Sequence, residues 1–378
     1  ISQEQADAVA SLKLPGVAFR EEYKRCYMNG RTACHVLGFT NIDEVGMEGV
    51  EAVLDPLLSS KRGSQVLMRD ALGRKITPAN GPDSESDARD GKDLYLSLDL
   101  VVQQILEEEL DALCVKWTPA SVSGIVMDPS TGDILALANR PAFDPNDPAA
   151  YPYEARRNRA LTDPIEPGST FKPFILAAVL QEKLVSLSQR IDCENGVFTR
   201  GGRTLRDASS HGVMTVEEIV SKSSNIGMAK IGIILASACG REVMRDWVRA
   251  FDFGTRTDCD MLPLSAESPG KVTELRKWSD YTTTSVSMGH EISVTPMQLV
   301  KGYSALANDG VLLQPRIVLA AVEPGSGARP DLVYPEPVVV RRAVRHDITG
   351  KVVGVMCKVV TDGTGKKGAV QGYVVAGK

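Results

Sequence analysis

The pattern of apolar and polar residues divides the chain into two regions. Lys75–Lys92 is rich in Pro, Gly, Asp and Ser and has no apolar periodicity, which is typical of an exposed linker. Before it, short apolar segments such as His35–Phe39 and Val66–Leu72 are separated by glycine-containing turns and predict a small β-containing module. We therefore place a domain boundary in this linker, with residues 1–92 as one module and residues 93–378 as a second domain.

The second region begins with alternating strand and helix signals. Leu94–Leu98 alternates like a strand, Asp99 can cap a helix, and Val101–Leu113 has apolar residues at helical spacing. Ser121–Met127 and Asp133–Ala138 are strand-like runs on either side of a Pro- and Gly-containing turn, which predicts a β-hairpin.

Helical periodicity dominates the rest of the chain. Apolar residues recur at helical spacing in five further segments, at about residues 170–184, 215–236, 241–251, 296–308 and 347–360. Tyr373–Ala376 is a final apolar run that predicts a strand. This order of elements predicts an α+β domain with helices packed on an antiparallel sheet.

Composition and charge exclude several classes of protein. The 378 residues suffice for about two domains, and the net charge of −5 gives no reason to expect a nucleic-acid partner. Apolar stretches such as Phe174–Leu180 and Ile231–Gly240 fall short of the roughly 20 residues of a membrane span. The chain starts without Met or an export signal, so we expect that the native N-terminus, with any anchor, lay upstream.

The sequence has seven cysteines, and none of them form a C-x-x-C pair. We expect them to be mostly free, buried thiols.

Ser169 is the first candidate for a catalytic residue. Pro167-Gly168 predicts a turn directly before a helical run, which leaves Ser169 at the helix N-terminus with Lys172 on the same face. A serine hydroxyl needs a base to become nucleophilic, and Lys172 could be that base if burial or a neighbouring cation lowered its pKa. The spacing alone is weak evidence, since Ser268-Pro-Gly-Lys271 shows it too and is expected to be only a loop.

Two further segments carry candidate residues. Ser223 and Asn225 lie where small polar residues interrupt a helical region, which suits proton transfer and amide recognition but also a helix cap. Gly372 and Lys378 match the start of a phosphate-binding loop, G-x-x-x-x-G-K. The β-forming residues between them argue against nucleotide binding and favour a lysine at the end of a strand.

Taken in order, Ser169-x-x-Lys172, Ser223-x-Asn225 and Lys378 resemble the three motifs of penicillin-recognising serine enzymes. Longer segments resemble class B penicillin-binding proteins; they are Val126–Asn139, Asn158–Asp163, Val294–Val300 and Tyr303–Asn308, and, for the pedestal region of that family, His35–Phe39 and Gly46–Glu51. The resemblance runs from about residue 23 to 378. Thr162, Asp163 and Glu166 favour the division-specific branch over the elongation-specific one.

The resemblance implies a serine D,D-transpeptidase fold and activity, without metal or organic cofactor. Ser169 would attack a D-Ala-D-Ala stem peptide, Lys172 would take its proton, Ser223 would relay a proton and Asn225 would hold the peptide amide. Lys378 would attract the terminal carboxylate. In the family the third motif reads Lys-Thr-Gly, of which only Lys378 is in this sequence, so we expect weakened acylation in a protein that ends there.

The resemblance also implies partners and a location. Peptidoglycan stem peptides, glycan strands made from a lipid-linked precursor and β-lactam antibiotics would bind, as would division-complex membrane proteins, including a glycosyltransferase. The protein would work on the extracytoplasmic face of the inner membrane, held by an N-terminal helix.

Three alternatives remain open at this point. A D,D-carboxypeptidase or β-lactamase would differ only in using water for deacylation, although Glu166 is not where a deacylating glutamate is expected. A Ser-His-Asp hydrolase is disfavoured because G-x-S-x-G is absent and the four histidines lie outside the serine motifs; we expect His211 and His290 to be structural. A non-catalytic division scaffold or β-lactam sensor would keep the fold.

Overall fold

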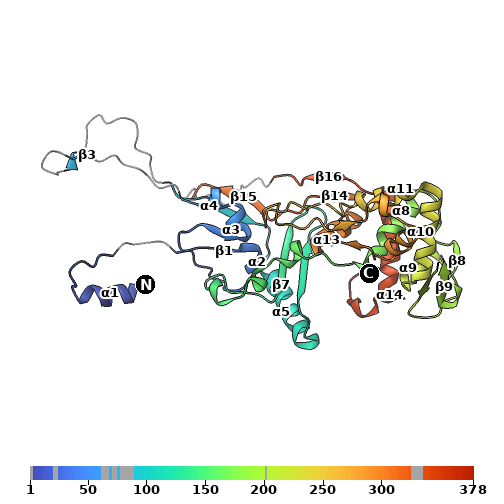
Figure 1. Ribbon diagram of the computed structural model, residues 1–378, viewed down its shortest axis with the longest axis horizontal. Helices are drawn as coiled ribbons and strands as arrows, with labels where there is room; N and C mark the ends of the chain where they lie inside the picture. The colour runs from blue at the N-terminus through green and yellow to red at the C-terminus, as the bar shows by residue number, and fades with distance from the viewer. Residues whose placement is uncertain are drawn as a thin grey trace.

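The computed structural model describes residues 3–19, 24–60, 89–200, 202–324 and 335–378, and the backbone of two short strands at 68–69 and 75–76. The molecule is elongated, with the pedestal module (residues 1–92) at one end and a helix-rich lobe at the other (Figure 1). None of the helices in these ranges has the length and apolar character of a membrane span.

The pedestal module contains short helices as well as strands. Its elements are α1 (Gln3–Ser11), α2 (Cys34–Leu37), β1 (Phe39–Thr40), β2 (Gly46–Glu48), α3 (Gly49–Val53), α4 (Asp55–Leu58), β3 (Met68–Arg69) and β4 (Lys75–Ile76). The prediction of β structure across His35–Phe39 is therefore wrong for its first part, because α2 continues to Leu37 and is followed by the C-cap Gly38, whose φ of 76° favours glycine. Apart from β3 and β4, which pair with each other, Val66–Leu72 and most of the predicted linker lie outside the described residues.

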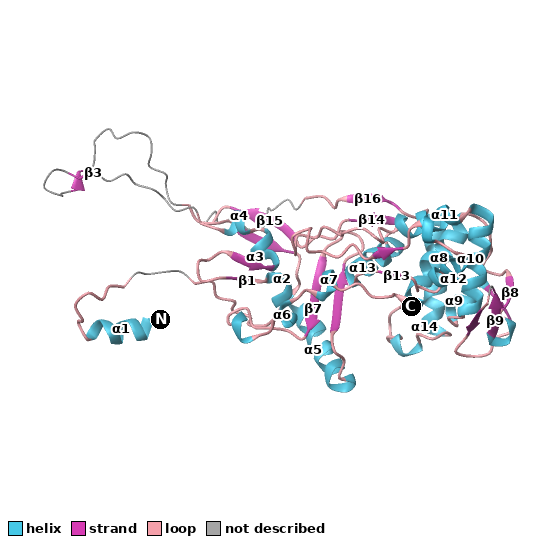
Figure 2. Ribbon diagram, viewed as in Figure 1, coloured by secondary structure: helices cyan, strands magenta, loops and turns pink. Residues whose placement is uncertain are grey.

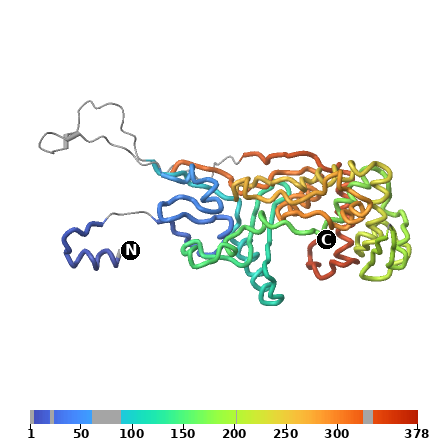
Figure 3. Tube along the Cα trace, viewed as in Figure 1, coloured from blue at the N-terminus to red at the C-terminus, as the bar shows by residue number. Residues whose placement is uncertain are grey.

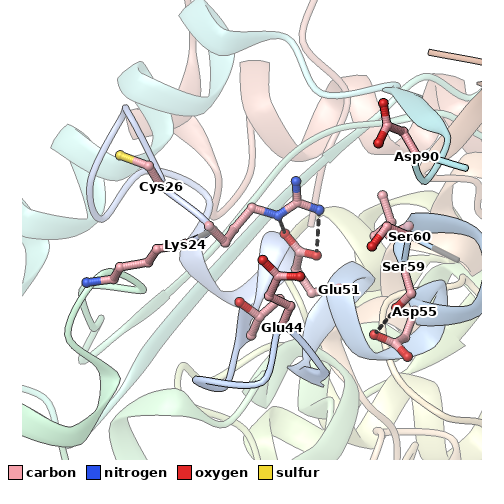
Figure 4. Close-up of a pocket in the computed structure, with 11 residues that line it drawn as sticks. Lys24, Cys26, Glu44, Glu51, Asp55, Ser59, Ser60 and Asp90 are labelled. Atoms are coloured by element: carbon pink, nitrogen blue, oxygen red, sulfur yellow. Dashed lines mark hydrogen bonds and ion pairs between the residues drawn. The ribbon is translucent and has the colours of Figure 1, made fainter. Parts of the chain in front are cut away.

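A polar cavity of about 390 Å³ lies in this module (Figure 4). The Arg25 Nε atom lies 2.8 Å from Glu51 Oε1 across it, and Ser59 donates a hydrogen bond to Asp55. The contact between Arg25 and Glu51 ties α3 to the chain that enters the module, whereas the bond between Ser59 and Asp55 lies within the end of α4.

A helix and a hairpin connect the two ends of the molecule. They are α5 (Leu100–Trp117), β6 (Val122–Met127) and β7 (Ile134–Arg140), preceded by β5 (Asp93–Leu96). The predicted cap and hairpin are both confirmed, because Asp99 accepts hydrogen bonds from the N–H groups of Val101 and Val102, and β6 pairs antiparallel with β7. Val36 and Val50 of the pedestal share an apolar cluster with Leu137 of the hairpin, so both regions use one core.

The helix-rich lobe holds the second core. Its helices are α8 (Lys172–Gln181), α9 (Val216–Ser221), α10 (Asn225–Cys239), α11 (Arg241–Ala250), α12 (Asp280–Val286), α13 (Pro296–Ala307) and α14 (His346–Thr361). Short helical segments are η1 (Pro148–Ala150), α6 (Tyr153–Arg156), α7 (Arg159–Thr162), η2 (Gly168–Phe171), η3 (Glu194–Gly196), η4 (Leu275–Lys277) and η5 (Lys366–Gly368). Every residue of α8 from Lys172 to Leu180 is buried, so this helix is the centre of the lobe (Figure 2).

The strands of the described residues form eight antiparallel pairs, as expected for an α+β fold, but not one continuous sheet. The remaining strands are β8 (Arg190–Asp192), β9 (Val197–Arg200), β10 (Arg203–Arg206), β11 (Val213–Thr215), β12 (Lys271–Val272), β13 (Ile292–Ser293), β14 (Val311–Leu313), β15 (Val318–Val322) and β16 (Val339–Arg342). The strand predicted at Tyr373–Ala376 is wrong, because a strand forms by pairing and none of the described strands pairs with these residues. This segment runs beside the helix-rich lobe (Figure 3).

All seven cysteines are free, as expected, but only Cys34, Cys193 and Cys259 are buried.

Candidate active site

Ser169 lies on an exposed turn that leads into the most buried helix of the lobe. It belongs to η2, which continues directly into α8, and Gly168 before it has a φ of 54°. The Gly168 N–H donates to the Gly289 carbonyl over 3.0 Å, and a Cβ on Gly289 would lie 2.0 Å from the Gly168 carbonyl oxygen. This close backbone approach requires glycine and fixes the turn that presents Ser169.

Lys172 is buried directly below this turn, with 0% of its surface exposed. Its Nζ donates to the Ser223 carbonyl at 2.7 Å, to Ser223 Oγ at 3.1 Å and to Asn225 Oδ1 at 2.9 Å. Burial, together with a smaller effect of the positive charge of Lys378, lowers the pKa of Lys172 to about 7. The amine can therefore be neutral near physiological pH, as a general base must be.

Ser223 connects Lys172 to Ser169. It lies between α9 and α10, where the sequence predicted an interruption, and its φ of 64° puts a non-glycine residue in the left-handed region. In this conformation Ser223 Oγ donates to Ser169 Oγ over 3.0 Å. The hydrogen-bonded path from Lys172 to Ser169 therefore runs through Ser223.

Asp207 holds the turn that carries Ser223 and Asn225, and the sequence analysis missed it. One carboxylate oxygen accepts from Ser224 Oγ at 2.6 Å, and the other accepts from the Ile226 N–H at 3.1 Å and from the Asn225 N–H. It thus caps the N-terminus of α10 from outside that helix. No local motif signals this role, because Asp207 follows β10 and meets the turn only in the folded chain.

Lys378 approaches the same cluster from the C-terminal segment. Its Nζ lies 3.5 Å from Thr364 Oγ1, and the Gly377 N–H donates to the Met356 carbonyl in α14. Burial lowers the pKa of Lys378 to about 8. The positive charge of Lys378 contributes to the lowered pKa of Lys172.

His290 and Glu166 form a pair beside the turn that carries Ser169. His290 Nδ1 lies 3.2 Å from Glu166 Oε2, the Glu291 N–H donates to Glu166 Oε1, and these contacts lower the pKa of Glu166. The His290 side chain is 49% exposed, and the structural role expected for it stays a prediction. The second S-x-x-K, Ser268 to Lys271, forms a loop and the start of β12, as expected.

Metal-binding side chains are not gathered at this site. Across the described ranges, no group of three or more His, Cys, Asp or Glu residues is arranged to hold a metal ion.

Comparisons with known proteins agree with the family resemblance and the two regions found in the sequence. A family model for the penicillin-binding protein transpeptidase domain matches residues 122–378, and a model for the penicillin-binding protein dimerisation domain matches residues 1–96. The chain belongs to the penicillin-binding protein transpeptidase family. This penicillin-binding protein is 32% identical, over 100% of its length, to the Escherichia coli peptidoglycan D,D-transpeptidase FtsI. It is 34% identical, over 99% of its length, to the probable peptidoglycan D,D-transpeptidase PenA of Neisseria meningitidis. It spans 60% of the length of each of these curated relatives.

A solved structure agrees with these relatives. Penicillin-binding protein 3 of Mycobacterium tuberculosis superimposes with a TM-score of 0.79 at 30% identity, covering 92% of this chain and 74% of the other. That protein has also been solved in complex with ampicillin. The class B transpeptidase fold expected from the sequence is therefore confirmed.

Proposed function

We propose that this penicillin-binding protein is a serine D,D-transpeptidase that cross-links peptidoglycan stem peptides. The observation that supports this most is the hydrogen-bonded path from Lys172 through Ser223 to Ser169, together with a pKa of about 7 for the buried lysine. Acyl transfer by serine requires a base that can take the proton of the nucleophile, and this path connects a base, a relay and a nucleophile in that order.

In the proposed mechanism, Lys172 accepts a proton through Ser223 while Ser169 Oγ attacks the carbonyl of the penultimate D-Ala. N–H groups at the start of the helix, which lack helical partners, stabilise the negative oxygen. Ser223 then passes the proton to the leaving D-Ala amine. Asn225 holds the peptide amide, and Lys378, when protonated, attracts the terminal carboxylate.

The similarity to FtsI supports a role in septal wall synthesis. For the whole protein we propose an extracytoplasmic location at the inner membrane. We also propose glycan strands, β-lactams and division-complex membrane proteins, including a glycosyltransferase, as its partners.

Turnover of a donor peptide tests this function. The full-length protein, given a D-Ala-D-Ala stem peptide and an amine acceptor, should release D-Ala and form the cross-linked product, whereas Ser169→Ala should do neither. Release of D-Ala without cross-linked product would identify a D,D-carboxypeptidase instead. Equal turnover by Ser169→Ala would reject Ser169 as the nucleophile.

A further inference from the structure

Tyr303 of α13 contacts the turn that carries Ser169, one residue after that serine. Its hydroxyl donates a hydrogen bond of 2.6 Å to the carbonyl of Thr170, which lies 133 residues earlier in the chain. Its ring packs edge-on against Phe174 of α8, with the two ring centroids 5.1 Å apart. The Tyr303 side chain thus connects α13 both to the helix that follows Ser169 and to the turn before that helix.

The carbonyl that Tyr303 contacts lies where a backbone hydrogen bond cannot form. The turn η2 is a 3₁₀ helix, in which the Lys172 N–H donates to the Ser169 carbonyl three residues before it. The next bond of this series would run from residue 173 to the Thr170 carbonyl. Residue 173 is Pro173, which has no N–H to donate. The Tyr303 hydroxyl therefore takes the place of the missing backbone donor.

The 3₁₀ form of the turn decides where Ser169 points relative to Lys172. Side chains three residues apart eclipse each other in a 3₁₀ helix, whereas in an α-helix they are about 60° apart around the axis. The 3₁₀ turn therefore brings Ser169 over Lys172. Ser223 Oγ bonds to both side chains, at 3.0 Å and 3.1 Å. Winding the turn as an α-helix would rotate Ser169 away from this hydrogen-bonded path.

An α-helical turn would have its own donor for the same carbonyl. In that form the Thr170 carbonyl would accept from the N–H of Phe174, four residues later. The α-helix begins only at Lys172, however, so Thr170 belongs to the 3₁₀ turn. The Tyr303 hydroxyl occupies the Thr170 carbonyl from outside the helix and so favours the 3₁₀ form over the α-helical one.

We propose that Tyr303 is a positioning residue for acylation: its hydroxyl holds the Thr170 carbonyl, keeps the turn in its 3₁₀ form and so keeps Ser169 in contact with Ser223. The proposal rests on the proposed transpeptidase function. Tyr303 itself takes no proton from the nucleophile, because its hydroxyl is bonded to the Thr170 carbonyl and burial raises the pKa of Tyr303. Its loss should therefore slow the attack by Ser169 without changing the titration of Lys172.

Removal of the hydroxyl alone tests this role, because Tyr303→Phe keeps the ring that packs against Phe174. In the full-length protein, stopped flow at increasing concentrations of a fluorescent penicillin separates the rate constant of acylation from the dissociation constant of the initial complex. The rate constant should fall about tenfold, because a hydrogen bond to a partly buried carbonyl is worth roughly that factor. The dissociation constant should not change.

Two controls separate positioning from a structural or a proton-transfer role. The rise of acylation as pH increases through about 7 should stay in place in Tyr303→Phe, since the contacts of Lys172 are intact. Tyr27→Phe removes a hydrogen-bonded hydroxyl from the pedestal and should acylate like the wild type.

A second substitution tests the role of the missing N–H. Pro173→Ala gives residue 173 a backbone donor, so the turn depends less on the Tyr303 hydroxyl. In this background Tyr303→Phe should lower the rate constant of acylation by less than about threefold, because the two positions act on one carbonyl and are coupled. Equal losses with and without Pro173→Ala would show that the hydroxyl acts elsewhere and would overturn the proposal.

The remaining outcomes are distinguishable. If the wild type is acylated and Tyr303→Phe keeps its rate constant, the positioning role is wrong and the transpeptidase function stands, whatever the melting temperature of the variant. A shift in the pH dependence of Tyr303→Phe would mean that the hydroxyl acts on the titration of Lys172, which also contradicts a positioning role. If the wild-type protein forms no acyl-enzyme, the proposed function fails as well.

Discussion

Lys172 combines a buried amine with neutral hydrogen-bond acceptors. Its ammonium form has lost its hydration, and its neighbours are a carbonyl, a hydroxyl and an amide oxygen and not a carboxylate. Burial therefore outweighs the more distant attraction of Asp207, and the pKa falls. A lysine in such a position can act as a base, whereas an arginine cannot.

Replacing Lys172 by arginine tests this base role. Lys172→Arg keeps the positive charge but should slow acylation by at least about 100-fold, because general-base steps are typically worth about 10²–10⁴ in rate. Acylation by a fluorescent penicillin would be followed by stopped flow in a protein whose circular dichroism is unchanged. Lys222→Arg, on the exposed neighbouring turn, is the matched control, and near-normal acylation of Lys172→Arg would indicate another base.

The two lysines predict a bell-shaped dependence of acylation on pH. Acylation should rise as pH increases through about 7, because Lys172 must lose its proton to act as a base. It should fall as pH increases through about 8, because Lys378 must keep its proton to attract the carboxylate. The second-order rate constant for acylation gives both limits, and a rate independent of pH across this range would contradict both roles.

At the scale of single residues, the sequence predicted the site residues that lie within local motifs. It missed those that come together only in the folded chain. Ser169, Lys172, Ser223 and Asn225 lie in one hydrogen-bonded cluster, and their spacing had singled them out. The path through Ser223 could not be predicted, because it depends on the left-handed conformation of that residue. Asp207 and the pair of His290 with Glu166 join segments far apart in the chain.

At the scale of elements, apolar periodicity found the helices that bury an apolar face. The interruption predicted around Ser223 and Asn225 is confirmed, because residues 222–224 separate α9 from α10. Helix α12 was not predicted, because Thr282–Ser285 has low helix propensity and little apolar character. It forms because Ser279 caps its N-terminus and its threonines are buried in the lobe.

A buried ion pair fixes α13 to the end of α11. Lys301 Nζ lies 2.6 Å from Asp252 Oδ2, with only 2% of the lysine side chain exposed, and Arg341 contacts the other oxygen of Asp252. Lys301→Met should lower the free energy of unfolding by about 3–5 kcal/mol, because it leaves a buried carboxylate with one partner fewer. Lys358→Met breaks an exposed pair with Glu217 and should cost less than about 1 kcal/mol. Urea unfolding of both variants measures the difference, and equal losses would show that burial does not strengthen the first pair.

At the scale of the whole molecule, the two regions seen in the sequence share a core. Val36 and Val50 of the pedestal pack in the same cluster as Met297 at the start of α13. The boundary at residue 92 stays a prediction. The sequence predicted the order of the regions from composition, but it could not predict their contact, because packing between distant segments leaves no local periodicity.

The site is assembled from segments of the helix-rich lobe that are far apart in the sequence. The turn at Ser169 opens α8, the turn at Ser223 opens α10, and Lys378 approaches along α14. The turns that open α8 and α10 are far apart in sequence and meet where Ser223 Oγ donates to Ser169 Oγ, which makes Ser169 the centre of the proposed chemistry.

The most direct measurement is the mass of the full-length protein after reaction with benzylpenicillin. One intact antibiotic molecule should be added, and peptide mapping should locate it at Ser169. Ser169→Ala should show no added mass, whereas Ser268→Ala, which alters the serine of the second S-x-x-K, should be labelled like the wild type. Unchanged labelling of Ser169→Ala, or an adduct mapped to another serine, would contradict the assignment of Ser169 as the nucleophile.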